Sequence, residues 1–481
     1  MPHDLEGKGN NMNDQKSVSD MAPDDWECSK ENPRNWTTAK KWTTMSVVSL
    51  YALLAPLGSS MMAPALLQVS TRYDITNDTI LAMTLSIFLL SFALGSLTLP
   101  PLSEMYGRKW LLHLSNIAFA VFNLVCAFAP TTGTLIAFRL LSGYPGAGPV
   151  SIGGGCVADL FREEERASAM ALYTLGPLVG PVIGPVIGGY VAEELSVKYV
   201  FIIVSAACGV AALVGLPLLR ETYAPVLRRR LFEKADPEKA SAVSTSSGAV
   251  IENKWGYLWT NMTRPATLLF TSLICFALSL YMAFLYGIYY LMFAVFASFF
   301  RDTYGFSAGQ GGLCYLGLGV GFFASTAVSS RFGDQVYNML CARNGGVGKP
   351  EFRIPSLIFG SFFIPISLFW YGWSAEAKMH WIMPIIGTGI FGFGLMLTFL
   401  PIQLYLVDAF HYAASAFGAG AVFRCLCGFA FPLFGKQMYD VLGMGIGNTL
   451  LGVLAIVLGI PFPVYLYFYG EGIRKRSNLH R

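Results

Sequence analysis

The sequence predicts an all-α membrane protein with twelve transmembrane helices in two six-helix bundles. Composition is the first observation behind this prediction, because 54% of the 481 residues are hydrophobic and 13% are charged, about half the charged fraction of an average soluble chain. The spacing of apolar stretches is the second, since a helix that crosses a bilayer needs about 20 apolar residues. We place such stretches at residues 43–65, 80–103, 110–129, 134–157, 168–191, 199–219, 266–297, 309–330, 354–373, 379–402, 412–434 and 445–468.

The fifth stretch supplies the third observation, the run GPLVGPVIGPVIGGY at residues 176–190. Glycines recur there every four residues, which places them on one side of a helix and leaves that side almost bare. In water, glycine and proline inside a helix cost about 1 and about 3 kcal/mol relative to alanine. A bilayer tolerates them, because small residues let helices pack closely. We expect the bare side to lie against a helix of the other half, at the central seam.

Lysine and arginine predict the orientation of the chain. If the N-terminus is cytoplasmic, most of the 33 basic residues fall in cytoplasmic segments, as the positive-inside rule requires. Both termini are then cytoplasmic, because the number of spans is even. This topology explains the formal net charge of +4, which therefore gives no reason to expect a nucleic-acid partner.

A long polar segment divides the spans into two sets of six. The first half has Gly95 and Gly107 twelve residues apart, and the second half has Gly321 and Gly333 at the same spacing. Such a repeat indicates two bundles around a cavity. We expect a disordered cytoplasmic tail with an interfacial segment at 1–41, the first bundle at 42–219, a cytoplasmic linker at 220–265, the second bundle at 266–469 and a cytoplasmic tail at 470–481.

Residues 31–42, ENPRNWTTAKKW, combine tryptophan with lysine just before the first span. This mixture predicts a helix that lies at the inner membrane interface. Two roles fit it: a simple anchor for the first span, or a latch on the cytoplasmic face.

Three motifs carry a resemblance to a known family. GSLTLPPLSEMYGRK at residues 95–109 resembles the signature of the major facilitator superfamily, in the form found in fungal drug:proton antiporters. RLLSGYPGAG, which begins at Arg139, is similar to the fourth-span motif of that family, and GPVIGPVIGG from Gly180 is similar to its antiporter motif. Relatives with these motifs export polyamines, antifungals or secondary metabolites, and the motifs do not separate these cargoes.

The resemblance implies a secondary active transporter that exports a small organic molecule by proton antiport with alternating access. Its partners are then the small-molecule substrate, protons and the lipid bilayer. Proton-coupled uptake and a transporter-like membrane sensor are the alternatives. No nucleotide-binding loop, metal cluster or nucleophile motif is visible in the sequence, so we expect neither an enzyme nor a cofactor. We expect a monomer in the plasma membrane, with a vacuolar or vesicle membrane as alternatives.

Charged residues converge at the inner ends of spans two to five. Opposite charges at one membrane face can form a lock that opens when a carboxylate is protonated or when the helices part; the alternative is a topology anchor with a structural ion pair. Most of the proposed gating role rests on the resemblance. The candidate gating and coupling residues are Gly95, Glu104, Gly107, Arg108, Lys109, Arg139, Asp159, Arg162 and Asp408.

Arg139 and Arg424 are the charged residues that lie well inside predicted spans, where charge is costly and usually functional. The family motif implies a proton relay for Arg139, and the alternative is hydrogen bonding to carbonyls of a neighbouring helix. Arg424 is either a packing element or part of a cavity. No Asp or Glu lies in the middle of a predicted span, so the sequence assigns no proton carrier. The lack of carboxylates also favours a neutral, aromatic or anionic cargo over a polycationic one.

The remaining candidates concern packing, cargo and glycosylation. The antiporter motif assigns close packing to Gly180, Gly184, Pro185, Gly188 and Gly189. Aromatic rings crowd the seventh span and offer apolar area with polar tips; as a cargo surface we nominate Tyr281, Phe284, Tyr289 and Arg424. Asn77 in the first outer loop begins a possible N-glycosylation site.

Overall fold

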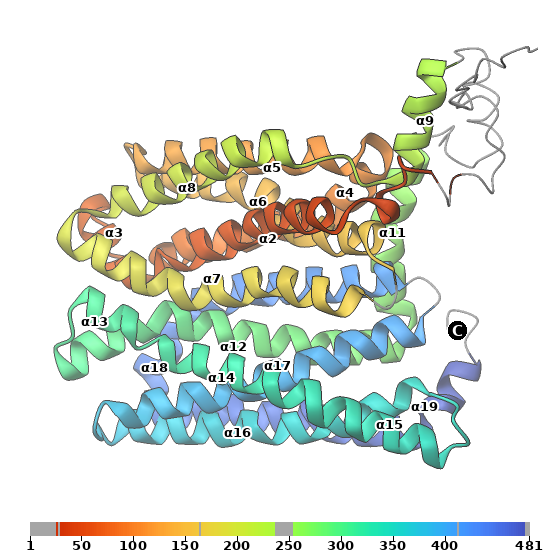
Figure 1. The fold of residues 1–481 in the computed structure, drawn as a ribbon. Helices are drawn as coiled ribbons and strands as arrows, with labels where there is room; N and C mark the ends of the chain where they lie inside the picture. Colours follow the sequence, from red (N-terminus) through yellow and green to blue (C-terminus); the bar gives the residue numbers. More distant parts are fainter. Residues whose placement is uncertain (1–25, 27–28, 163–164, 236–253, 411–412, 477–481) are drawn as a thin grey trace, which may run out of the picture.

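The computed structural model describes residue 26 and residues 29–162, 165–235, 254–410 and 413–476. Most of the tail predicted to be disordered lies outside these residues. Within them the regular structure is helical, without a β-strand, as the sequence predicts (Figure 1). The long helices run nearly side by side, and α7 lies where the first set of helices meets the second.

In the described part of the first half, six long helices run back and forth with short connections. A short helix α3, Leu66–Tyr73, and the turn η3, Ala63–Ala65, follow the first of them. The six are α2 (Thr38–Ser60), α4 (Asp78–Tyr106), α5 (Arg108–Ala127), α6 (Thr132–Leu160), α7 (Arg166–Glu194) and α8 (Val197–Leu218).

Two helices, α9 (Ala224–Ala235) and α11 (Lys254–Thr271), connect the halves on either side of residues 236–253, which lie outside the described ranges. The second half follows the same back-and-forth course. Its helices are α12 (Leu273–Tyr304), α13 (Ala308–Leu313), α14 (Leu316–Val328), α15 (Asp334–Arg343), α16 (Ile354–Glu376), α17 (Ile382–Ala409), α18 (Ala413–Gly459) and α19 (Pro461–Arg476).

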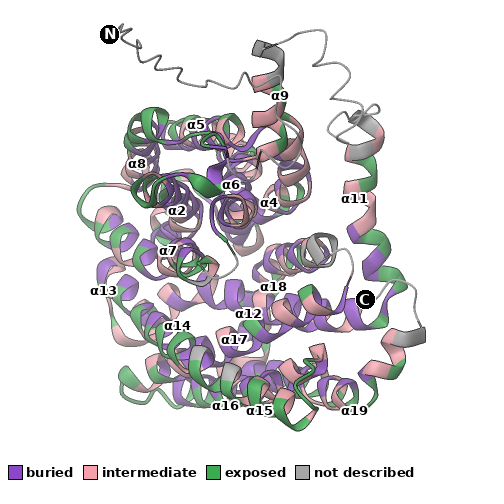
Figure 2. Ribbon diagram, turned by 45° about the vertical axis from the view of Figure 1, so that its right-hand side comes forward, coloured by how far each residue is buried: buried purple, intermediate pink, exposed green. Residues whose placement is uncertain are grey.

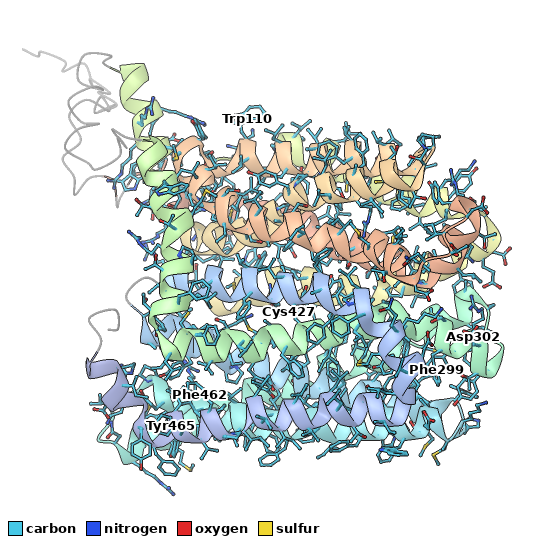
Figure 3. The ribbon with its side chains drawn as sticks, turned by 180° about the vertical axis from the view of Figure 1, so that it is seen from behind. Trp110, Phe299, Asp302, Cys427, Phe462 and Tyr465 are labelled. Atoms are coloured by element: carbon cyan, nitrogen blue, oxygen red, sulfur yellow. The ribbon has the colours of Figure 1, made fainter. Side chains whose placement is uncertain are left out.

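Among the described residues, ten helical stretches are long and apolar enough to cross a membrane. Two features reconcile this number with the twelve predicted spans. Helix α6 has 29 residues but is not among the ten, since its glycines and Arg139 dilute its apolar residues. The stretch Gly418–Arg474 holds two helices, because the backbone of Gly443 is non-helical (φ 75°, ψ 169°). Figure 3 shows Cys427, before this break, and Tyr465, after it, on separate helices.

We call the end of the bundle where α2 begins and α19 ends the proximal end, and the opposite end the distal end. The proximal end carries α9, α15 and α19, on the right of Figure 1, and the distal end carries α3 and α13. Buried residues line the sides where helices face one another, and exposed residues lie mainly on outward sides (Figure 2). Many of the exposed ones are large and apolar, such as Trp110, Leu213 and Val441, as a lipid-facing surface requires.

Residues 31–42 do not form the separate interfacial helix that the sequence predicts. Pro33–Asn35 make a short 3-10 turn, which Asn32 caps by accepting a hydrogen bond from the backbone of Arg34. Helix α2 then begins at Thr38 and runs directly into the first span. The fixed φ of Pro33 and the Asn32 cap favour a turn here over a helix.

The bare side of α7 does not face the other half, so this prediction is wrong. A Cβ on Gly176, Gly180, Gly184 or Gly188 would meet the backbone of α2 and of Met61, which follows it. These glycines therefore fasten α7 to a helix of its own half.

A second face of α7 meets the other half. A Cβ on Gly189 would meet the carbonyl of Ala308, and one on Gly312 would meet the carbonyl of Pro185. A Cβ on Gly319 of α14 would likewise meet Val182. Glycines on both sides thus let α7 approach α13 and α14 closely.

Candidate functional site

A buried cluster at the proximal end centres on Arg108, the first residue of α5. Its Nε forms an ion pair with the carboxylate of Asp159 near the end of α6, and its Nη1 donates to Ser103 Oγ at 3.1 Å. Thr222, after α8, donates to the same Asp159 oxygen at 3.2 Å. The side chain of Arg108 also lies 5.0 Å from the ring centre of Tyr223. The cluster therefore joins α4, α5, α6 and the segment after α8 at one point.

Glu221 belongs to this cluster, although the sequence analysis assigned it no role. Its carboxylate accepts hydrogen bonds from the backbone nitrogens of Arg108 at 2.9 Å and Lys109 at 3.3 Å, and the residue is 6% exposed. A negative charge at the start of a helix is favourable. Gly107 has φ 100°, and a Cβ there would collide with this carboxylate. The sequence signal is the run ETYAPVL, which begins at Glu221 just after the sixth predicted span.

The other proximal candidates divide into those that join this cluster and those that do not. Glu104 is half-buried and lies close enough to Arg108 to act on its charge. Lys109 contributes its backbone nitrogen, while its ammonium lies 5.4 Å from the ring centre of Trp110. Arg162 is exposed and lies outside the cluster. Gly95 sits against the Tyr144 carbonyl of α6, so it serves close packing of α4 on α6.

The second half has a related cluster at the same end. Asp408, at the end of α17, pairs with Arg353 just before α16 at 3.3 Å. These positions correspond to those of Asp159 and Arg108 in the first half. Glu351 pairs with Arg474 through two contacts of 2.8 and 2.9 Å. Here the last helix, α19, supplies the arginine, whereas in the first half the segment after α8 supplies the carboxylate.

Polar contacts join the two halves at the distal end. Lys436 of α18 pairs with Asp78 of α4 at 2.9 Å, and Thr79 donates to the Leu433 carbonyl at 3.2 Å. On the other side of the bundle, Glu193 of α7 accepts from the backbone nitrogen of Gly309 at 2.7 Å. The proximal ion pairs described above each stay within one half. These polar contacts therefore join the two halves at the distal end.

Asn77 stands at this distal contact. It is exposed, and its side chain caps α4 by accepting from the backbone nitrogens of Thr79 and Ile80. Its glycosylation stays a prediction.

Arg139 lies in the interior, far from the proximal cluster. It is 0% exposed, donates to the carbonyls of Thr84 and Leu85 on α4 at 3.3 Å each, and has its guanidinium 5.1 Å from the ring centre of Phe88. This is the geometry of the structural alternative, in which the arginine bonds to a neighbouring helix. Its Nη1 is buried and has no hydrogen-bond partner.

The aromatic residues of α12 that were nominated as a cargo surface contact different parts of the molecule. Tyr281 packs against Gly459 and stands apart from the other rings. Phe284 meets Phe431 of α18 at 5.8 Å between ring centres, and Tyr289 meets Phe322 of α14 at 6.1 Å. The nominated set is therefore spread over different neighbours.

Tyr286 and Tyr290, which were not nominated, are the α12 residues at the seam. The Tyr290 hydroxyl lies 3.1 Å from Ser59 Oγ of α2, a contact between the halves. The Arg424 guanidinium lies 4.9 Å from the ring centre of Tyr286. These two tyrosines connect the seam to Arg424.

Comparisons with known proteins identify the family of the chain. The sequence matches the model of the Major Facilitator Superfamily over residues 48–432. The MFS transporter cpaT of Aspergillus oryzae is 45% identical over 446 residues, which cover 92% of this chain and 90% of that protein. The efflux pump vrtL of Penicillium aethiopicum is 42% identical, with 93% of this chain and 89% of that protein covered.

Solved structures support the fold. The xylose transporter XylE from E. coli, in a partially occluded inward open conformation, has a TM-score of 0.64 at 13% identity and covers 90% of this chain and 98% of its own. A bacterial homolog of the human lysosomal transporter Spinster has a TM-score of 0.62 at 13% identity, with 92% and 99% covered. The chain is a multi-pass membrane protein of a non-enzymatic class and belongs to the Major Facilitator Superfamily.

Proposed function

We propose that this protein exports a small organic molecule, such as a drug, toxin or secondary metabolite, by proton antiport with alternating access. The contact pattern carries the proposal: polar contacts join the halves at the distal end, while the described proximal ion pairs lie within single halves. Two such halves are suited to rocking about a site between them. Relatives named as efflux pumps, vrtL and radE, support the direction of transport.

We place the proximal end in the cytoplasm, because the segments at that end hold most of the basic residues. The two bundles are then residues 42–219 and 266–469, joined by a cytoplasmic linker. In this orientation the distal contacts between the halves face the outside, which supports a state that loads cargo from the cell. We propose the plasma membrane as its location and a monomer as its working form.

The proximal cluster of the first half is proposed to hold that half rigid while it rocks. Arg108, Asp159 and Glu221 join helix ends of one half, so the half moves as a unit. A change of charge at Asp159 releases α5 from α6 and loosens that unit.

A resistance and accumulation screen tests the export. Deletion and overexpression strains of the native host are compared for growth on toxic compounds and for intracellular accumulation. Overexpression is expected to lower accumulation of at least one compound class, and deletion to raise it. Higher accumulation on overexpression would instead indicate uptake, and no change for any compound would favour a sensor.

Vesicles test the coupling. Inside-out vesicles with an acid interior are expected to accumulate the exported compound, and a protonophore to abolish that accumulation. Equal accumulation without the gradient would contradict proton antiport.

A matched glycine pair serves as the control for this assay. Gly184→Leu places a side chain against Ser60 and the Leu57 carbonyl and is expected to inactivate transport, whereas Gly209 faces open space and Gly209→Leu is expected to keep it. Equal activity of the two variants would show that the contact of α7 with α2 has no role in transport.

A further inference from the structure

Two arginine side chains lie inside the bundle without a carboxylate partner. Arg139 is 0% exposed and its Nη1 has no hydrogen-bond partner, and the Nε of Arg424 is also buried without one. Among the described residues neither guanidinium forms an ion pair. A buried charge without a counter-charge is costly in a protein and more so at membrane depth. The interior therefore favours an anion.

Arg424 lies on the side of α18 that faces the seam between the halves. Gly428 is one helical turn further along α18, and a Cβ there would meet Leu89 of α4 and the ring of Tyr286. Residues four apart in a helix share a face. Arg424 therefore lies next to the α4 and α12 contact, one turn nearer the proximal end, from which cargo is proposed to enter.

One aromatic ring lies against this guanidinium, and two more rings lie beside that one. Arg424 lies 4.9 Å from the ring centre of Tyr286, and that ring stacks with Phe399 of α17 at 6.4 Å and 28°. Tyr290, one turn along α12, lies 5.1 Å from Tyr286. A guanidinium next to apolar rings binds a planar anionic group through two parallel hydrogen bonds, while the rings pack against an apolar body.

Other cargo classes fit these residues less well. A cation would meet two positive charges, and no carboxylate of the described residues forms an ion pair with either arginine to offset them. A neutral molecule would leave both guanidinium groups without a counter-charge. An organic acid satisfies the charge of Arg424 and the apolar rings together.

We propose that the cargo is an organic acid carried as its anion, with its charged group on Arg424 and its aromatic or apolar body against Tyr286 and Phe399. This inference rests on the export proposed above and adds the chemical class of the cargo. Arg139 contributes a second positive charge from the first half, near Tyr290 and the Ser59 contact.

Transport of two dyes with one ring framework tests the charge preference. Fluorescein is anionic and rhodamine 6G is cationic, and both contain a xanthene core. In inside-out vesicles the wild-type protein is expected to accumulate fluorescein at least tenfold above rhodamine 6G. Equal accumulation, or a preference for rhodamine 6G, would overturn the anion inference and leave the export standing.

Substitutions locate the anion site. Arg424→Gln removes the charge and is expected to lower fluorescein accumulation about tenfold or more, the effect of losing hydrogen bonds to a charged group. Arg424→Lys keeps the charge and is expected to retain part of the activity. Arg72 is exposed in α3, so Arg72→Gln is the matched control. Wild-type accumulation by Arg424→Gln at equal membrane abundance would overturn the assignment.

Binding to the purified full-length chain separates cargo class from transport. In detergent, 2-naphthoate is expected to raise the melting temperature, while the uncharged 2-naphthamide is not, and Arg424→Gln is expected to abolish the difference. Equal stabilisation by the acid and the amide, or no stabilisation by the acid, would overturn the inference. Stabilisation by the acid together with no accumulation of either dye in vesicles would support the anion site and contradict the export.

A lipid phosphate is another anion that could reach the seam. The binding measurement is therefore repeated in the presence of phosphatidylglycerol and of phosphatidylcholine. Loss of naphthoate binding in phosphatidylglycerol alone would assign the site to an anionic lipid and overturn the cargo inference, whereas unchanged binding supports it.

Discussion

The two halves carry charge clusters at corresponding positions of the proximal end, but the corresponding Arg–Asp pairs in these clusters differ in burial. The side chains of Arg108 and Asp159 are 8% and 16% exposed, whereas those of Arg353 and Asp408 are 20% and 35% exposed. Water screens an exposed pair, while removal of one partner from a buried pair leaves an unpaired charge. The corresponding pairs of the repeat are therefore expected to contribute unequally to stability. The fold of the first half is expected to depend more on Arg108 and Asp159 than the fold of the second half depends on Arg353 and Asp408.

The largest expected effect is that of Arg108→Met. It leaves the Asp159 carboxylate buried beside Thr222 without its cation, which costs about 3–5 kcal/mol of the free energy of unfolding. We expect a strongly lowered melting temperature of the purified chain in detergent and loss of transport. Arg301→Met, at an exposed pair with its neighbour Asp302, is the control. A melting temperature equal to that of the control would show that the buried pair contributes no stability.

Glu351→Gln is expected to rank second. The Glu351 and Arg474 side chains are 6% and 12% exposed and share two hydrogen bonds. The change removes the carboxylate charge and one of the two acceptor oxygens, so the Arg474 guanidinium loses its counter-charge. Hydrogen bonds to charged groups contribute about 1.5–3 kcal/mol, which the same melting experiment measures. An effect larger than that of Arg108→Met would place the more sensitive cluster in the second half and break the comparison.

Glu221→Gln is expected to have a smaller effect, about 1 kcal/mol. The amide oxygen still accepts from the backbone nitrogen of Arg108, and what is lost is the negative charge at the start of α5 together with the longer bond from the Lys109 nitrogen to the second carboxylate oxygen. Glu221→Ala removes the acceptor as well and is expected to cost more. If both variants melt alike, the hydrogen bonds contribute nothing beyond the charge.

Asp408→Asn is expected to have the smallest effect, below about 1 kcal/mol, because its pair with Arg353 is partly exposed. The melting temperature is expected to change little, and high salt is expected to reduce the difference from wild type further. A fall as large as that of Arg108→Met would mean that the two pairs are equivalent despite their different exposure.

Most of the fold could be predicted from the sequence. Bilayer thickness fixes the length of an apolar helix, and the positions of Lys and Arg indicate on which side of the membrane each connecting segment is expected. The boundaries were less accurate. The predicted first span began at residue 43, whereas α2 begins at Thr38. The break at Gly443 agrees with the division predicted between the last two spans, and Glu376 caps the helix after it by accepting from Met444.

The site was less predictable, since periodicity identifies a helix face but not the neighbour of that face. The four-residue glycine spacing in α7 located a bare side correctly, yet its partner is α2 and not the other half. Glu221 was missed because its role depends on a helix start more than a hundred residues earlier in the chain. Tyr286 was passed over for Tyr281, because spacing along α12 does not reveal the position of Arg424 on α18.

The two glycine-lined faces of α7 have a mechanical consequence. Toward α2, backbone packs on backbone at four successive turns, so the two helices have no room to separate and are expected to move together. Toward α13 and α14, small residues lie on both sides, and few side chains have to leave a groove when one helix slides past the other. Helix α7 is thus expected to slide easily along α13 and α14 and to stay attached to α2. The rate at which the transporter switches between inward- and outward-facing states is then expected to depend on the side-chain size at positions 182, 185 and 189.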